Sequence, residues 1–301
     1  MKNFLLTAVA LLLSVMAAAQ TDYEMVVEKT DGSKSVFNTN IIKQTYFQKL
    51  DQEPGIFQGA KRVFGNYLVK AFGTEGQDRY EINYDANGFV RSINRTEYSE
   101  GGNYLHSWLF SYQTDGRILM SYFRDGMLDE VYYATVGGNG FISSIRVEQL
   151  FEATLSYDEE GHLVQIIWTD VEEKYDTSTA VETFTWMDGD LVRDNMVYQD
   201  DDDDDNSNIS YISLTQAVPI ENVAGIMDYY FGMGIDIEVL EQLYYIGGLG
   251  KGTKHLPMAW ANDSNSGNNV WTLDSQNRPV KMVCTRKSYE KTDERTLFWE
   301  W

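Results

Sequence analysis

Apolar and polar residues alternate along much of the chain, most clearly between residues 79 and 214. Tyr80, Ile82 and Tyr84, for example, occupy every second position of one segment, with polar residues between them. A period of two puts successive side chains on opposite faces of a β-strand, so each such segment is predicted to be a half-buried strand. The predicted strands cover residues 25–29, 35–37, 65–72, 79–84, 107–112, 118–123, 130–136, 141–148, 152–157, 163–171, 182–186, 191–198, 208–214, 270–273, 280–286 and 295–301.

A short motif marks turns between these strands. Tyr84–Gly88, Tyr112–Gly116 and Tyr157–Gly161 each run from a tyrosine to a glycine four places later, and Leu273–Asn277 is a weaker copy. Glycine adopts the left-handed backbone that a tight hairpin requires, and asparagine tolerates it better than other residues. The motif therefore predicts hairpins in which the first residue anchors the turn to the buried face.

The predicted fold class is all-β. Turn glycines recur at intervals that fit two short strands and their connections, which is typical of an up-and-down antiparallel meander. Strongly twisted open sheets rarely exceed about ten strands without curling or closing. We therefore expect a meander curled into a barrel or half-barrel, and the pattern leaves open whether the barrel closes.

Residues 220–246 interrupt the strand pattern. Apolar residues follow helical spacing near the start of this segment and again from Ile237 to Tyr244, with Asp236 in place to cap the second stretch. Gly247 and Gly248 would end it. A short helical insertion of two helices is predicted, covering one mouth or one face of the sheet.

The N-terminus predicts export. Residues 1–19 have a basic start, an apolar middle and small residues before Gln20, which is typical of a removed signal peptide. The remaining residues 20–301 are expected to form a single β-rich domain. Cys284 is the only cysteine, so no internal disulfide can form and the cleavage region has no thiol to accept a lipid. We expect a periplasmic or extracellular protein that is not a classical lipoprotein.

The charge balance excludes one class of partner. Against 24 basic residues stand 46 acidic ones, a net charge of −22, which repels phosphate-rich nucleic acid. Part of the excess is the run Asp200–Asp205. It is expected to be a solvated loop, since it lacks the alternating spacing with which a calcium-binding loop wraps one ion.

Candidate chemistry is sparse. His106, His162 and His255 occur singly, without the spacing of a metal site. Cys284 alternates with apolar residues on a predicted strand and has no identifiable basic partner, so it is expected to be a small buried side chain. No nucleophile elbow or phosphate-binding loop is present in the sequence. We predict no catalytic residues, no metal ligands and no cofactor.

Two further classes are less favoured. A carboxylate-dependent glycoside hydrolase needs two facing carboxyl groups, which cannot be selected from so many acidic residues without the fold. The last residues, Leu297–Trp301, alternate as strands of outer-membrane barrels do, but Leu191–Asp194 carries charges on both faces. A lipid-facing strand must be apolar on one face, so an integral membrane protein is not expected.

Two resemblances follow from these residues. The turn motif resembles the tyrosine-aspartate repeats of bacterial secreted proteins. A broader likeness rests on the leader ending Ala19-Gln20, the segment Met25–Ser33, the repeated hairpins and the segment Leu249–Pro257. On these features, the chain resembles a secreted, Bacteroidota-type domain of unknown function with a porin-like fold. This resemblance implies a curved antiparallel sheet and no catalytic residues.

Aromatic residues are the remaining candidates for function. Tyrosine, phenylalanine and tryptophan make up 14% of the chain. Such residues form cores, but a curved sheet can also leave a concave aromatic face open to an acyl chain, a peptide or a sugar. The leading hypothesis is non-enzymatic binding of an apolar or amphiphilic ligand, and the alternative is a cell-envelope interaction or adhesion protein acting through its hairpin loops. The speculative ligand-binding residues are Trp108, Tyr112, Tyr122, Trp168 and Trp186.

Overall fold

The computed structural model describes residues 24–28, 34–38, 57–147, 151–170, 179–198, 208–210, 221–226, 237–261, 265–288 and 291–301. Contacts divide the chain into two units, Met1–Asp51 and Gln52–Trp301. In the first unit, β1 (Glu24–Glu28) pairs antiparallel with β2 (Lys34–Asn38), as predicted. The predicted signal peptide and the run Asp200–Asp205 lie outside the described residues.

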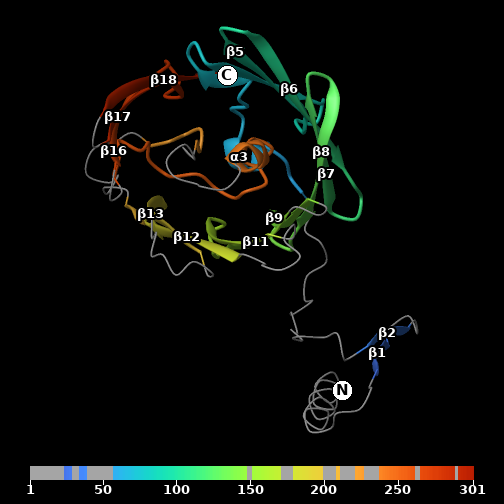
Figure 1. The fold of residues 1–301 in the computed structure, drawn as a ribbon. Coiled ribbons are helices and arrows are strands. Elements are labelled where there is room, and N and C mark those ends of the chain that lie inside the picture. The colour runs from blue at the N-terminus through green and yellow to red at the C-terminus, as the bar shows by residue number, and fades with distance from the viewer. Residues whose placement is uncertain are drawn as a thin grey trace. The chain divides into compact units, whose positions relative to one another are not determined.

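The second unit is an antiparallel β-barrel (Figure 1). The described strands that form it are β3 (Ala71–Thr74), β4 (Asp78–Tyr84), β5 (Val90–Ser99), β6 (Gly102–Tyr112), β7 (Arg117–Arg124), β8 (Met127–Val136), β9 (Ile142–Val147), β10 (Phe151–Tyr157), β11 (Leu163–Asp170), β12 (Thr179–Met187), β13 (Asp190–Tyr198), β14 (Asn208–Ser210), β15 (Ala259–Ala261), β16 (Asn265–Leu273), β17 (Pro279–Ser288) and β18 (Thr292–Glu300).

Each strand of the barrel pairs with the next in sequence, which confirms the predicted meander. The ring closes where β18 returns to β3, with Trp299 opposite Phe72. Its narrowest join is between β14 and β15, which share the single pair Ser210 and Ala261. Closure leaves the two ends of the meander paired with each other, so neither remains a free edge.

One predicted strand begins later than expected. Within residues 65–72, only Ala71 and Phe72 belong to β3. The residues before them follow α2 (Lys61–Phe64), which ends at Gly65 with a φ of 60°. That left-handed residue and the turn bond from the Tyr67 N–H to the Phe64 carbonyl, 3.1 Å long, use the backbone groups that a strand would need.

The turn motif forms the hairpin turns that its spacing predicted. Gly88, Gly116, Gly161 and Asn277 all have positive φ, between 60° and 91°. The motif aspartate adds a role that the spacing did not show: the Asp85 Oδ1 accepts hydrogen bonds from two backbone N–H groups of its own turn, 2.8 and 3.0 Å long. Because the strands alternate in direction, these turns all lie at one end of the barrel, here named the turn end.

The motif tyrosines anchor each turn through their hydroxyl groups. The hydroxyls of Tyr84, Tyr112 and Tyr157 donate to backbone carbonyls 2.7 to 2.8 Å away, while their rings pack against the core. Burial raises the pKa of each hydroxyl well above its ordinary value, because the ionised form would lose its hydration. The phenols therefore remain protonated donors.

Replacing Tyr157 with phenylalanine tests this anchor. The change keeps the ring but leaves the Ile142 carbonyl without its 2.7 Å hydrogen bond, so we expect the free energy of unfolding to fall by about 1 to 2 kcal/mol. Urea denaturation would measure it, with Tyr133→Phe, at an exposed tyrosine, as the control. Equal midpoints for the two variants would contradict the anchoring role.

Side chains alternate between the inside and the outside of the barrel. On β6, His106, Trp108 and Phe110 are buried, whereas Leu109 and Ser111 between and beside them are exposed. The same alternation continues on the neighbouring strands, and the buried set forms one hydrophobic core. Most of the buried side chains are therefore apolar, whereas the outward face carries charged and polar residues together with some apolar ones such as Leu109.

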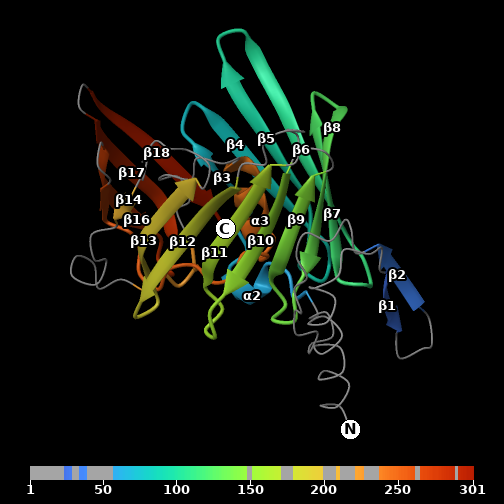
Figure 2. The same ribbon diagram turned by 60° about the horizontal axis from the view of Figure 1, so that its bottom comes forward.

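Helix α3 (Ile237–Tyr245) lies inside the ring of strands (Figures 1 and 2). Its Leu240, Leu243 and Tyr244 are fully buried. Gly247 ends it with a φ of 83°, at a place where a Cβ atom would lie 2.4 Å from the Gly59 carbonyl oxygen. This confirms the second predicted helix. Among the described residues, no helix combines the length and apolar character needed to cross a membrane.

The first of the two predicted helices is not formed over its described part. Residues 221–226 make a turn and a β-bridge between Glu221 and His255. The Asn222 side chain both donates to the Ile226 carbonyl (2.6 Å) and accepts from the Ile226 N–H (3.2 Å). An asparagine that satisfies the backbone in this way competes with helix formation, which explains the difference.

Candidate functional site

Three of the five aromatic residues singled out from the sequence are core residues. Trp108 and Tyr122 are cross-strand partners on β6 and β7, with ring centroids 5.1 Å apart. They are 1% and 6% exposed, and Trp168 on β11 is 3% exposed. The structure brings Trp108 and Tyr122 together, while Trp168 packs against Phe151 instead, at a centroid distance of 5.6 Å.

The other two lie at the turn end and are half-buried. Tyr112 stacks on Phe57, with centroids 5.4 Å apart. Trp186 stacks on His162 at 4.4 Å and donates its indole N–H to the Leu163 carbonyl, 2.7 Å away. The five residues therefore do not share one surface, and their role in ligand binding stays a prediction.

An aromatic stack joins the interior helix to the barrel wall. From Tyr245 on α3, it passes through Phe72, Tyr80 and Trp108 to Tyr122, with successive centroid distances of 4.0, 4.5, 6.2 and 5.1 Å. Each contact adds about 0.5 to 1.5 kcal/mol beyond the area that it buries. The stack therefore links α3 to the strands β3, β4, β6 and β7.

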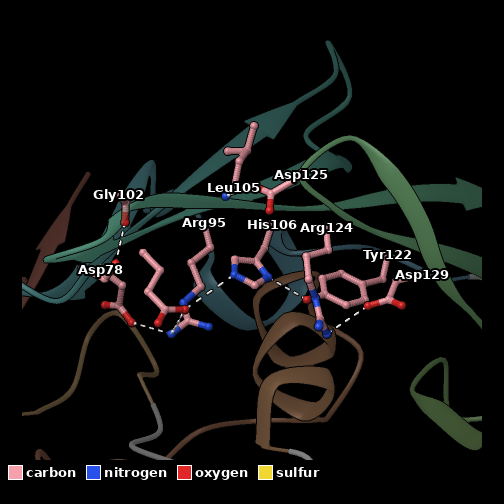
Figure 3. Close-up of polar contacts among 11 residues, drawn as sticks. Asp78, Arg95, Gly102, Leu105, His106, Tyr122, Arg124, Asp125 and Asp129 are labelled. Atoms are coloured by element: carbon pink, nitrogen blue, oxygen red, sulfur yellow. Dashed lines mark hydrogen bonds and ion pairs between the residues drawn. The ribbon is translucent and has the colours of Figure 1, made fainter.

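A polar network on the inner wall shares Tyr122 with this stack (Figure 3). The Nδ1 atom of His106 is 2.6 Å from the Tyr122 hydroxyl, and its Nε2 atom is 3.5 Å from a Glu97 carboxylate oxygen. Arg95 lies 3.3 Å from Asp78 and 3.6 Å from Glu97. The charges of the network are thus paired with one another. These contacts connect the four strands β4 to β7.

A second polar feature is a pair of buried carboxyl groups on the neighbouring strands β12 and β13. Glu182 on β12 and Asp194 on β13 are 1% and 5% exposed, and the indole N–H of Trp168 is a polar neighbour of Glu182. Burial, reinforced by its neighbour's charge, raises the pKa of Glu182 well above its ordinary value. Burial raises the pKa of Asp194 to about 7. The pair therefore holds at least one proton near neutral pH.

A groove of about 440 Å³ crosses the outer wall formed by β7, β8, β9 and β10, which lie side by side in Figure 2. The strand register places Thr135, Ser144 and Thr154 in one cross-strand row, with Arg117 at its end. These three short side chains form the floor. The hollow exists because neighbouring outward positions hold much longer side chains.

The second row of the groove consists of Tyr133, Arg146 and Glu152, again cross-strand neighbours. Tyr133 is 39% exposed, so part of its ring faces solvent. Arg146 pairs with Glu152 at 3.3 Å, and Arg117 pairs with Asp115 at 2.6 Å. Both arginines thus have compensating carboxylates, and the groove is polar without a strong net charge.

Comparisons with known proteins identify the fold. No protein-family model matches the chain, and no curated protein matches it either. A porin-like protein from Bacteroides uniformis superposes with a TM-score of 0.63 at 13% identity, over 82% of this chain and 99% of that one. The barrel has a porin-like fold. A second porin-like protein, from Bacteroides vulgatus, is 10% identical with a TM-score of 0.30, over 78% of this chain and 99% of that one.

The porin-like fold confirms one of the two sequence resemblances at the level of architecture. The resemblance to tyrosine-aspartate repeats stays a prediction, although the turn geometry of the motif is as expected. At 13% identity, the likeness concerns the fold alone.

The sequence did not reveal the polar network or the groove of the porin-like barrel wall. His106 occurs singly in the sequence, yet its position two residues before Trp108 places it on the same inward face, a signal that the alternation contains. The groove had a weaker signal. Its floor residues are spread over three strands, so only the register between strands aligns them.

Proposed function

We propose that this protein is a non-enzymatic binding protein of the bacterial cell envelope that acts through the outer wall of its barrel. The groove between β7 and β10 is the observation that carries the proposal. Its volume lies within the range of small-ligand sites, and it combines an aromatic ring with several polar groups.

The charged side chains on the outer face of the barrel support a function in an aqueous compartment. Outward residues of the barrel include Arg79, Glu81, Arg117, Arg146 and Glu152, whose side chains are between 32% and 63% exposed. A membrane barrel has an apolar outer band and a polar interior, whereas the outer face of this barrel mixes charged residues with apolar ones and most of its buried side chains are apolar. Export to the periplasm or to the cell exterior, which the N-terminal sequence predicts, is compatible with this charged outer face.

Binding without catalysis is favoured by the composition of the groove. Glu152 is the one carboxylate among its lining residues, and it is paired with Arg146. Glycoside hydrolysis uses two carboxyl groups facing each other across the bond. Glu182 and Asp194 are two neighbouring carboxyl groups, but they are buried in the interior of the barrel and do not line the groove.

An amphiphilic ligand inside the barrel is less well supported. Trp108, Tyr122 and Trp168 are buried to at least 94%, and the rings of Trp108 and Tyr122 belong to the stack that extends from α3. A ligand there would have to separate stacked rings, whereas the groove is already open to solvent.

Filling the groove tests the proposal. Ser144→Tyr places a large side chain on the groove floor, and Thr185→Tyr makes a comparable change at an exposed position of β12. We expect Ser144→Tyr to abolish co-sedimentation of the purified protein with isolated bacterial envelope material and Thr185→Tyr to leave it unchanged. Because both sites face outward, thermal unfolding should change by little in either variant. Equal co-sedimentation of the two variants would refute the proposal.

A further inference from the structure

We infer that the groove on β7 to β10 recognises a neutral oligosaccharide chain. The inference rests on the proposed function, and it assigns a ligand class to the same site. It follows from the charge of the groove, the chemistry of its floor and the pairing state of its strands.

Charge argues against an anionic ligand. Arg117 and Arg146 are the groove's cationic side chains, and each already has a carboxylate partner at 2.6 and 3.3 Å. The chain as a whole carries a net charge of −22, so its long-range field repels polyanions. A phosphorylated or uronic acid polymer would therefore have to displace Asp115 or Glu152 against that field.

The floor argues against an acyl chain. Thr135, Ser144 and Thr154 present a row of hydroxyl groups, each able both to donate and to accept hydrogen bonds. A lipid tail would cover these groups without replacing their hydration, which costs free energy. Sugar hydroxyls offer matching donors and acceptors, and the planar groups of Arg146 and Glu152 can bond two neighbouring hydroxyls each.

The wall argues against an extended peptide. Peptides often bind sheets by adding a strand to an exposed edge, but β7, β8, β9 and β10 are each paired on both sides within the closed ring. Their backbone groups are already used, so recognition must come from side chains. Tyr133 supplies the one partly exposed aromatic face of the groove, against which the C–H face of a sugar ring can pack.

The experiment is a glycan array of neutral and acidic bacterial and plant oligosaccharides, followed by calorimetric titration with the strongest neutral binder. We expect neutral chains to bind and Tyr133→Ala to weaken binding about tenfold. Tyr133→Phe should keep most of the affinity, because the ring face remains. Tyr98→Ala, at an outward tyrosine of β5 with 43% exposure, is the matched control and should bind like the wild type.

Three outcomes would overturn the inference: no neutral glycan binds, only acidic glycans bind, or Tyr133→Ala and Tyr98→Ala behave alike. The proposed function is tested separately, by the co-sedimentation of Ser144→Tyr. If Ser144→Tyr still abolishes co-sedimentation with envelope material while the array shows no neutral binder, the groove binds another ligand class. If Ser144→Tyr has no effect on co-sedimentation, the proposed function itself fails.

Discussion

Replacing Trp108 with alanine is expected to lower the free energy of unfolding by about 3 to 5 kcal/mol. Trp108 is 1% exposed and lies in the middle of the stack, with Tyr80 at 6.2 Å and Tyr122 at 5.1 Å. The substitution removes a large apolar side chain and leaves a cavity that the rigid barrel wall cannot close by collapsing. It also removes both stacking contacts at once.

Urea denaturation of the purified protein measures this effect. Tyr104→Ala provides the control, because Tyr104 is on the same strand but is 47% exposed, and its loss should change stability by less than about 0.5 kcal/mol. If Trp108→Ala were no more destabilising than this control, the stack could not be part of a packed core. The interior would then be open to a ligand, as the sequence-based hypothesis proposed.

The buried pair Glu182 and Asp194 is expected to make the protein less stable as the pH rises. Both carboxyls have raised folded-state pKa values, about 7 for Asp194, whereas exposed carboxyls titrate near pH 4. Between these values the native protein binds more protons than the unfolded chain. The stability that the protonated pair provides is thus fully present below about pH 4 and is lost as the pH rises through the folded-state pKa values.

The variant Asp194→Asn tests this pH dependence. Asp194→Asn removes one titrating group while keeping its shape, so its unfolding midpoint in urea should decline less between pH 5 and pH 8 than that of the wild type. Glu159→Gln, at an exposed turn residue, is the matched control and should follow the wild-type pH dependence. Parallel profiles for all three proteins would show that the pair does not titrate as its burial requires.

Much of the barrel was predictable because strands and hairpins are local features. The alternation around Trp108 identifies β6, and the spacing from Tyr157 to Gly161 identifies the turn between β10 and β11. The segment before β3 and the described residues 221–226 were predicted less well. There, Gly65 and the Asn222 side chain satisfy backbone groups in ways that an apolar period does not reveal.

The candidate site was much less predictable than the strands. Aromatic residues such as Trp168 were selected because they lie on strands, but the sequence left open whether the face that they share would be filled. The groove residues, by contrast, are ordinary serines, threonines and arginines with no distinctive spacing. Thr135 and Thr154 are 19 residues apart in the chain, with the whole of β9 between them, and only strand register places them in one row.

The sequence by itself determined the all-β class, the hairpin turns, the order of the meander and the helical character of residues 237–245. These follow from local backbone preferences and from the period of apolar positions, both of which act over a few residues. Only the tertiary structure decided that β18 returns to β3, that α3 lies inside the ring and that a groove crosses the outer wall. Those features depend on contacts between residues far apart in the chain, and the free energy of such contacts is set by how whole strands pack and align.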